Sequence, residues 1–126
     1  MIFFIPAYDQ ATSANLFIGY KVATTTSCKN GSIMMFGNDA TPEALTESLN
    51  ECAAPLFIMS HGRIDAVMTS RERKEDEVVA LASAQCTFLK QRNVYAFACN
   101  TATQLGQIAA QHGSIWLGYT GAISAP

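Results

Sequence analysis

Short apolar runs separated by turn residues recur along this chain and predict a series of β-strands. The runs at residues 54–60 and 93–99 are apolar without alternation, as expected of strands that are covered on both faces. The run at residues 15–24 alternates weakly and is predicted as a second strand, at an edge. A turn is predicted over residues 27–32, where the sequence reads SCKNGS. The predicted strands are residues 2–8, 15–24, 32–37, 54–60, 93–99 and 114–121.

The clearest predicted helix covers residues 41–52. Thr41 can serve as its N-cap, Pro42 suits the first helical position, and Glu43 suits the positive end of the helix dipole. Apolar residues recur at helical spacing and should face the core. They are Leu45, Leu49 and Cys52.

Two further helices are predicted downstream. Residues 101–113 combine helical spacing with Gly113, a typical C-terminal cap. His112 beside this cap is interpreted as a helix-end or half-buried face residue. Residues 75–91 place a set of apolar residues on one side of a helix. These are Val78, Leu81, Ala82, Cys86 and Leu89.

Strands and helices alternate from residue 32 to residue 121, which predicts an α/β sandwich with a mostly parallel central sheet. Functional residues of such sheets lie beyond the carboxyl ends of the strands. His61 follows one predicted strand and Cys99 ends another. Both residues are therefore predicted at the same edge of the sheet.

The composition excludes several classes of protein. The chain has 126 residues, 49% hydrophobic and 14% charged, with a net charge of −2, which favours one globular domain and gives no reason to expect a nucleic-acid partner. Its basic cluster at residues 71–77 is interleaved with acids and is predicted to be a solvated loop or a helix start. No apolar run approaches the roughly 20 residues of a membrane span, so no membrane partner is expected.

The start of the chain and its cysteines favour a reducing compartment. Residues 1–9 lack a basic region before the apolar run, so we expect a first strand rather than a signal peptide, and a cytoplasmic location. The four cysteines have no CxxC spacing, which gives no support for a zinc site or a disulfide framework. No metal and no cofactor are predicted. Cys52 and Cys86 are interpreted as core-filling residues.

Cys99 and His61 together can perform nucleophilic chemistry. A free thiol has a pKa of about 8.5, and a neighbouring imidazole can take its proton or pair with the thiolate. Cys99 precedes a predicted helix, whose first amides and dipole would favour a negative sulfur. Gly62 allows close approach of the main chain to a reacting carbonyl, and its N–H could donate to an oxyanion. The expected reaction is acyl transfer through a thioester.

Each residue also has an ordinary structural explanation. A cysteine that ends a buried strand often only fills space, and a His-Gly pair after a strand often forms a turn. The chain has only two histidines, however, and one of them ends the strand that precedes the strand of Cys99. This coincidence favours the catalytic interpretation.

The segment LFIMSHG at residues 56–62, followed by VYAFACNTATQLG at residues 94–106, resembles the signature blocks of clan CD cysteine peptidases. In this group of caspases, metacaspases, gingipains, separases and CHAT proteins, one strand ends in His-Gly and a later one in Ala-Cys. The sequence FACNT differs from the caspase QACRG type. With GSIWLGYTGAIS at residues 113–124, it is more similar to CHAT and related bacterial proteins. The resemblance covers about residues 55–124.

This resemblance implies a three-layer caspase-hemoglobinase-like sandwich and a cysteine endopeptidase that acts on a protein or peptide. It assigns His61 as the base, Cys99 as the nucleophile and Gly62 as an oxyanion donor, with the Cys99 amide as a second donor. Asp9 after the first strand is expected either to bind a basic substrate residue or to form a turn.

The expected organisation is one domain over residues 1–126, as a fragment, a processed subunit or a minimal form that a partner chain or a second copy completes. Two alternatives remain open at this point. One is a catalytically silent caspase-like module that regulates a partner. The other is a different cysteine-dependent hydrolase or transferase on a Rossmann-like sheet.

Overall fold

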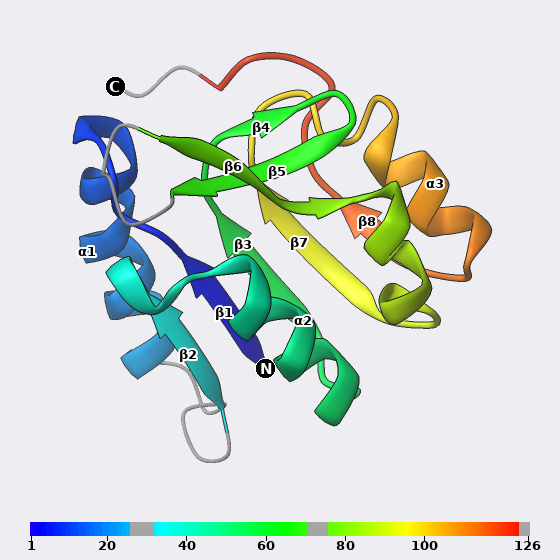
Figure 1. Ribbon diagram of the computed structural model, residues 1–126, viewed down its shortest axis with the longest axis horizontal. Helices are drawn as coiled ribbons and strands as arrows, with labels where there is room; N and C mark the ends of the chain where they lie inside the picture. Colours follow the sequence, from blue (N-terminus) through cyan, green and yellow to red (C-terminus); the bar gives the residue numbers. More distant parts are fainter. Residues whose placement is uncertain (26–31, 71–75, 124–126) are drawn as a thin grey trace.

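A five-stranded parallel sheet runs through the computed structural model, which describes residues 1–25, 32–70 and 76–123 (Figure 1). The strand order is β2-β1-β3-β7-β8. The strands are β1 (Ile2–Ile5), β2 (Ile33–Phe36), β3 (Leu56–Met59), β7 (Asn93–Phe97) and β8 (Ile115–Leu117). The prediction of an α/β protein with a mostly parallel central sheet is confirmed.

Helices lie on both faces of this sheet. One face packs against α2 (Pro42–Glu51), α3 (Leu105–Gln111) and the 3-10 helix η3 (Ser83–Leu89). On the other face, α1 (Gln10–Thr25) contacts β1, β2 and β3. A short 3-10 turn, η2 (Gly37–Asp39), follows β2. No helix in the described ranges is long and apolar enough to cross a bilayer.

A second, antiparallel sheet lies over the α2 face of the central sheet (Figure 1). Its strands are β4 (Gly62–Arg63), β5 (Ala66–Ser70) and β6 (Glu77–Ala82), in that order. Val67, Ala80 and Leu81 of this sheet are buried in the same core as β1, β3 and β7. We call this three-stranded sheet the hairpin. It covers part of one face of the central sheet, as helices do elsewhere in the molecule.

Helix α2 forms as its sequence predicts. Thr41 is the N-cap and its hydroxyl oxygen accepts a hydrogen bond from the Ala44 N–H at 3.1 Å. Pro42 occupies the first helical position, and Leu45 and Leu49 are buried. Cys52 is half-buried against this core, as expected of a residue at the end of the apolar stripe.

The prediction of a strand at residues 15–24 is wrong, because this segment lies in α1. Leu16, Gly19 and Ala23 face the sheet at helical spacing, and a Cβ built on Gly19 would lie 2.2 Å from the Ile5 side chain. The apolar residues between them face solvent, and they obscured the helical spacing of the buried residues. Phe17 is 75% exposed and other exposed apolar residues of the helix are Ile18 and Tyr20.

The prediction of a helix over residues 75–91 is also wrong. The first part is strand β6, which pairs with β5, and only Ser83–Leu89 is helical, as a 3-10 helix. Of the five residues predicted to face the core, Leu81, Cys86 and Leu89 are buried, while Val78 and Ala82 are half-buried. Pairing with β5, a strand that was not predicted, determined the structure of this segment.

The remaining predictions differ mainly in their boundaries. The other predicted strands and the helix at residues 101–113 are present but shorter. Gly113 caps α3 with a positive φ of 84°. His112 is the half-buried C-cap residue of α3. Cys28, most of the predicted turn at residues 27–32 and residues 71–75 of the basic cluster lie outside the described residues.

Candidate active site

Strands β3 and β7 bring His61 and Cys99 to one edge of the sheet. The two strands are parallel neighbours, and Met59 lies opposite Phe97 in their register. The Ser60 N–H continues this pairing past the strand end by donating to the Phe97 carbonyl at 3.2 Å. His61 and Cys99 each lie two residues beyond these paired positions. The chain segments that carry them therefore leave the sheet side by side.

Gly62 packs directly against the backbone of Cys99. A Cβ built on Gly62 would lie 2.5 Å from the Cys99 carbonyl oxygen and 2.6 Å from a methyl carbon of Thr101. Only glycine allows this approach. The sequence predicted that this glycine allows the approach of a substrate carbonyl. The structure gives a different reason, because the carbonyl that needs the space belongs to the chain itself.

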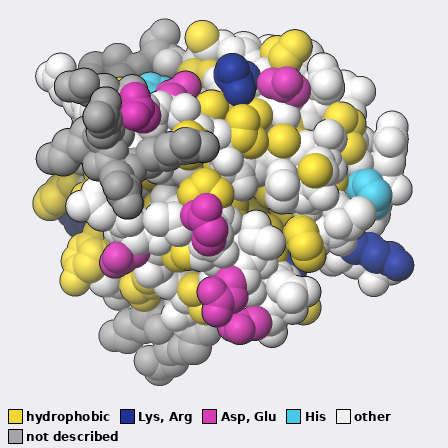
Figure 2. Space-filling model, in the orientation of Figure 1, with side chains coloured by type: hydrophobic (Ala, Val, Ile, Leu, Met, Phe, Trp, Pro, Cys, Tyr) yellow, Lys and Arg dark blue, Asp and Glu magenta, His cyan; other side chains and the backbone are white. Residues whose placement is uncertain are grey.

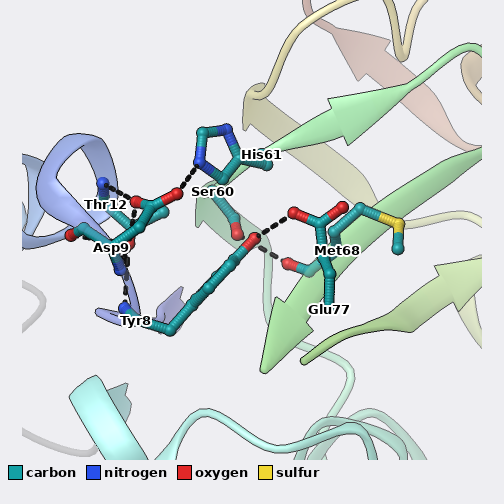
Figure 3. Close-up of polar contacts among 7 residues, drawn as sticks. All are labelled: Tyr8, Asp9, Thr12, Ser60, His61, Met68 and Glu77. Atoms are coloured by element: carbon teal, nitrogen blue, oxygen red, sulfur yellow. Dashed lines mark hydrogen bonds and ion pairs between the residues drawn. The ribbon is translucent and has the colours of Figure 1, made fainter. Parts of the chain in front are cut away.

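The His61 imidazole is paired with Asp9 (Figure 3). Its Nε2 lies 2.5 Å from Oδ2 of Asp9, with the two side chains 37% and 42% exposed. Asp9 follows β1, the strand on the other side of β3, so three adjacent strands supply this edge. An ionised carboxylate can only accept, so Nε2 carries the proton of this hydrogen bond. In the neutral ring, Nδ1 is then the nitrogen with a free lone pair.

Asp9 is held in place by the start of α1. Its Oδ1 accepts hydrogen bonds from the Thr12 N–H and the Thr12 hydroxyl, both at 2.8 Å. The Thr12 hydroxyl oxygen in turn accepts from the N–H groups of Tyr8 and Asp9 at 2.9 and 3.1 Å. Thr12 is fully buried. This reciprocal cap fixes Oδ1 and leaves Oδ2 directed at His61.

The same contacts determine the charge of Asp9. Partial desolvation disfavours its carboxylate, but hydrogen bonds from Thr12 and the bond and charge interaction with His61 outweigh this effect and lower its pKa. Asp9 is therefore ionised at neutral pH. A substrate-binding role for Asp9 gains no support, because both of its oxygens already have partners within the chain.

Tyr8 connects this edge to the hairpin (Figure 3). Its hydroxyl donates to Glu77 at 2.9 Å, and its ring contacts the His61 ring edge-on, with centroids 5.7 Å apart. Burial, followed by the hydrogen bond to Glu77 and its charge, raises the pKa of Tyr8, so the phenol stays protonated. The Ser60 hydroxyl donates to the Met68 carbonyl at 2.6 Å and adds a second tie to the hairpin.

Cys99 is half-buried and lies in a turn rather than at a helix start. Helix α3 begins only at Leu105, so the expected effect of a helix dipole on the sulfur is wrong. The Ile123 N–H contacts the thiol instead, at 3.2 Å from Sγ. Asn100 has a positive φ of 62°, an uncommon conformation that asparagine tolerates better than most residues. The chain thus turns sharply directly after Cys99.

Residues 119–123, which we call the strap, fold back over this turn. The Asn100 N–H donates to the Gly121 carbonyl at 3.0 Å and the Ala102 N–H donates to the Tyr119 carbonyl at 2.9 Å. The strap therefore pairs with the turn in an antiparallel manner, and its Ile123 contacts the sulfur of Cys99. No pattern in the sequence predicts this contact, since it depends on the direction of the chain after β8.

The structure brings the predicted residues to one edge without joining their functional atoms. No hydrogen bond links the imidazole of His61 to the sulfur of Cys99 among the described residues. Instead, Nε2 is paired with Asp9 and Sγ contacts the strap. The missed residue is Asp9 as the partner of His61. The sequence signal for Asp9 was Asp followed at three positions by Thr, a helix-capping pattern that follows β1, the strand that pairs with β3.

Other types of site find little support in the described part of the chain. No group of three or more His, Cys, Asp or Glu side chains in it could hold a metal ion. On the face drawn in Figure 2, acidic and basic side chains are scattered among uncharged ones rather than gathered into one patch. No protein-family model, curated protein or solved structure matches this chain.

Proposed function

We propose that this protein is a cysteine endopeptidase with a caspase-hemoglobinase-like fold, similar to the CHAT-type members of clan CD. The observation that carries the proposal is the convergence of His61 and Cys99 at the carboxyl edge of two paired parallel strands. The LFIMSHG and VYAFACNTATQLG segments add the family resemblance. Helices on both faces of a parallel sheet are compatible with the three-layer sandwich of that family.

In the proposed reaction, Cys99 attacks the carbonyl carbon of a peptide bond. Its thiol proton passes to Nδ1 of His61, the nitrogen that the pair with Asp9 leaves unprotonated. The protonated imidazole then gives this proton to the leaving amine, and a thioester remains on Cys99. Water attacks the thioester with His61 as base, which releases the carboxylic acid and restores the thiol.

Asp9 acts as a positioning residue in this scheme. Its carboxylate fixes the tautomer of His61 and stabilises the imidazolium that forms during each proton transfer. In this scheme the Cys99 side chain rotates to bring Sγ to Nδ1, because rotation of the imidazole would break its pair with Asp9. Such contacts often tighten only when substrate binds.

The N–H groups of Gly62 and Cys99 are the proposed donors to the oxyanion of the tetrahedral intermediate. This assignment is supported by the close packing of Gly62 on the Cys99 backbone, which holds the two peptide units together. A preorganised pair of donors acts on charge that develops only during the reaction.

A second candidate function is a catalytically silent module that binds and regulates a partner protein. The strap favours it, because the Ile123 N–H contacts Sγ of Cys99 in place of His61. This candidate predicts a folded protein that binds peptide without cleaving it.

Turnover of a fluorogenic positional-scanning peptide library separates the two functions. The wild-type chain is expected to cleave members of the library, and Cys99→Ala is expected to lose about a thousandfold or more of this activity because the nucleophile is gone. The matched control is Cys52→Ala, which removes a half-buried thiol from the end of α2 and should keep its activity.

Two results would contradict the endopeptidase. Residual cleavage by Cys99→Ala above about one-thousandth of wild type would exclude a nucleophilic role for this residue. Binding of peptides by a folded wild-type chain, without cleavage of any of them, would instead favour the silent module.

A further inference from the structure

The face of the sheet that carries α1 is open over its last two strands. Helix α1 contacts β1, β2 and β3, whereas Tyr95, Phe97, Leu117 and Tyr119 line an open groove over β7 and β8. Phe57 closes its β3 side, and the groove has a volume of about 400 Å³. We call it the β7–β8 groove. Its volume is in the range of known ligand sites.

This groove lies on the side of the sheet to which His61 points. Along β3, Leu56 and Ile58 enter the core beneath α2, while Phe57 and Met59 face α1. The His61 side chain continues the second set, because it reaches Asp9 at the start of α1. A substrate that approaches His61 from the α1 side therefore lies next to the groove.

The groove also begins close to Cys99. Phe97 precedes Cys99 by two residues, which corresponds to roughly 7 Å of extended chain. Tyr119 stacks edge-on against Phe97, with ring centroids 5.6 Å apart. The Tyr119 carbonyl accepts from Ala102, in the turn that follows Cys99. One wall of the groove is thus tied to the turn that carries the candidate nucleophile.

The side chains that line the β7–β8 groove indicate which kind of side chain it can bind. Four aromatic rings and Leu117 dominate it, and none of the described residues that line it carries a charge. Leu117 and Tyr119 remain 56% and 43% exposed, so apolar surface is available for contact. A large apolar side chain would gain from burial here, whereas a charged one would lose its hydration without finding a partner.

We infer that the β7–β8 groove receives a large apolar or aromatic side chain of the peptide substrate, within two residues of the scissile bond. This inference rests on the proposed function, and it names the substrate class of the same site. Specificity for a charged residue would need a charged partner, and Asp9 already uses both carboxylate oxygens within the chain.

The same peptide library tests the inference through its side-chain preferences. At one position within two residues of the cleaved bond, Phe, Tyr, Leu or Met should be preferred over Lys, Arg, Asp and Glu by about 10- to 100-fold in kcat/KM. Leu117→Asp should lower this preference at least tenfold and raise the relative rate for Lys and Arg, because it places a carboxylate in the groove.

Ile115→Asp is the matched control. Ile115 is 59% exposed and lies on the same strand as Leu117, but it does not line the groove. Both substitutions are at exposed positions, so both variants should keep the wild-type circular dichroism spectrum. The control should also keep the apolar preference.

The outcomes separate this inference from the proposed function. Cleavage that depends on Cys99 but favours charged residues, or an apolar preference that Leu117→Asp leaves unchanged, would overturn the inference and leave the endopeptidase intact. A wild-type dimer that Leu117→Asp dissociates without a change in substrate preference would also overturn it, since the groove would then bind a second copy. Absence of any cleavage by the wild-type chain would overturn both.

Discussion

The two carboxylate oxygens of Asp9 have different partners, one in the helix cap and one in the candidate site. Oδ1 caps α1 through Thr12, and Oδ2 pairs with His61. The capping contacts are local and short in sequence, while the pair with His61 spans 52 positions. A residue that starts a helix therefore also sets the orientation of the imidazole. Loss of its charge should affect both stability and the direction in which His61 points.

The Asp9→Asn variant should show the contribution of this charge through its pH dependence. Asparagine keeps the ability to cap α1, so the substitution mainly removes the carboxylate. Because folding lowers the pKa of Asp9 below its unfolded value near 3.9, its stabilisation is complete above that value and is lost as pH falls through the folded pKa. Because solvent screens the Asp9 side chain, which is 42% exposed, urea unfolding should give wild type an advantage of at most about 1 kcal/mol at pH 5 that shrinks towards pH 2.

The His61→Ala variant is the partner control for this measurement. It removes one hydrogen bond to Asp9 but leaves those from Thr12, so part of the acid dependence should remain. An advantage of wild type over Asp9→Asn that stays constant or grows on acidification would contradict this account.

At the scale of elements, the sequence predicted segments whose local signals agree with their packing. Helix α2 has a cap, a first-turn proline and one apolar face, and all of them match the structure. Helix α1 and strand β6 were mispredicted because exposed apolar residues such as Phe17 and Val79 obscured the period. Contacts between residues far apart in the chain determined the secondary structure of both segments. Gly19 packs on Ile5, and β6 pairs with β5.

The candidate site shows the same division between local and non-local information. His61 and Cys99 could be placed at one edge because the ends of parallel strands follow from the order of elements. The pair of His61 with Asp9 and the contact of Ile123 with Cys99 could not be predicted, since they join segments far apart in the chain.

Arg92 joins three elements that the sequence analysis treated separately. It is only 6% exposed, and its guanidinium donates to the carbonyls of Ala54 at 2.5 Å, Leu49 at 2.9 Å and Phe88 at 3.2 Å. These carbonyls belong to the chain before β3, the end of α2 and the end of η3. Arg92 thus satisfies buried acceptors at two helix ends and fixes both helices beneath the sheet.

The Arg92→Met variant should therefore lose about 2–4 kcal/mol of unfolding free energy, because three carbonyls lose a charged donor. Urea unfolding at pH 7 measures this loss. Lys90→Met is the matched control at an exposed position two residues away, and it should change stability by less than about 0.5 kcal/mol. Equal effects of the two substitutions would show that the buried hydrogen bonds of Arg92 contribute little.

At the scale of the whole molecule, the two faces of the sheet are covered unequally. Among the described elements, α2, α3, η3 and the hairpin sheet cover one face, whereas α1 is the helix that contacts the other. Sequence analysis predicted two covered faces for β7, but Tyr95 and Phe97 line the open β7–β8 groove. An apolar run indicates a strand that is suited to burial. It does not indicate which of its faces the rest of the chain covers.

The central claim is that His61 activates the thiol of Cys99. Its most direct test is the rate at which iodoacetamide alkylates each cysteine between pH 5 and pH 9, followed by mass spectrometry of the peptides. At pH 7, Cys99 should react at least about tenfold faster than Cys52, and His61→Ala should remove this difference by removing the base. A Cys99 that reacts no faster than Cys52, or at the same rate in wild type and His61→Ala, would contradict the claim.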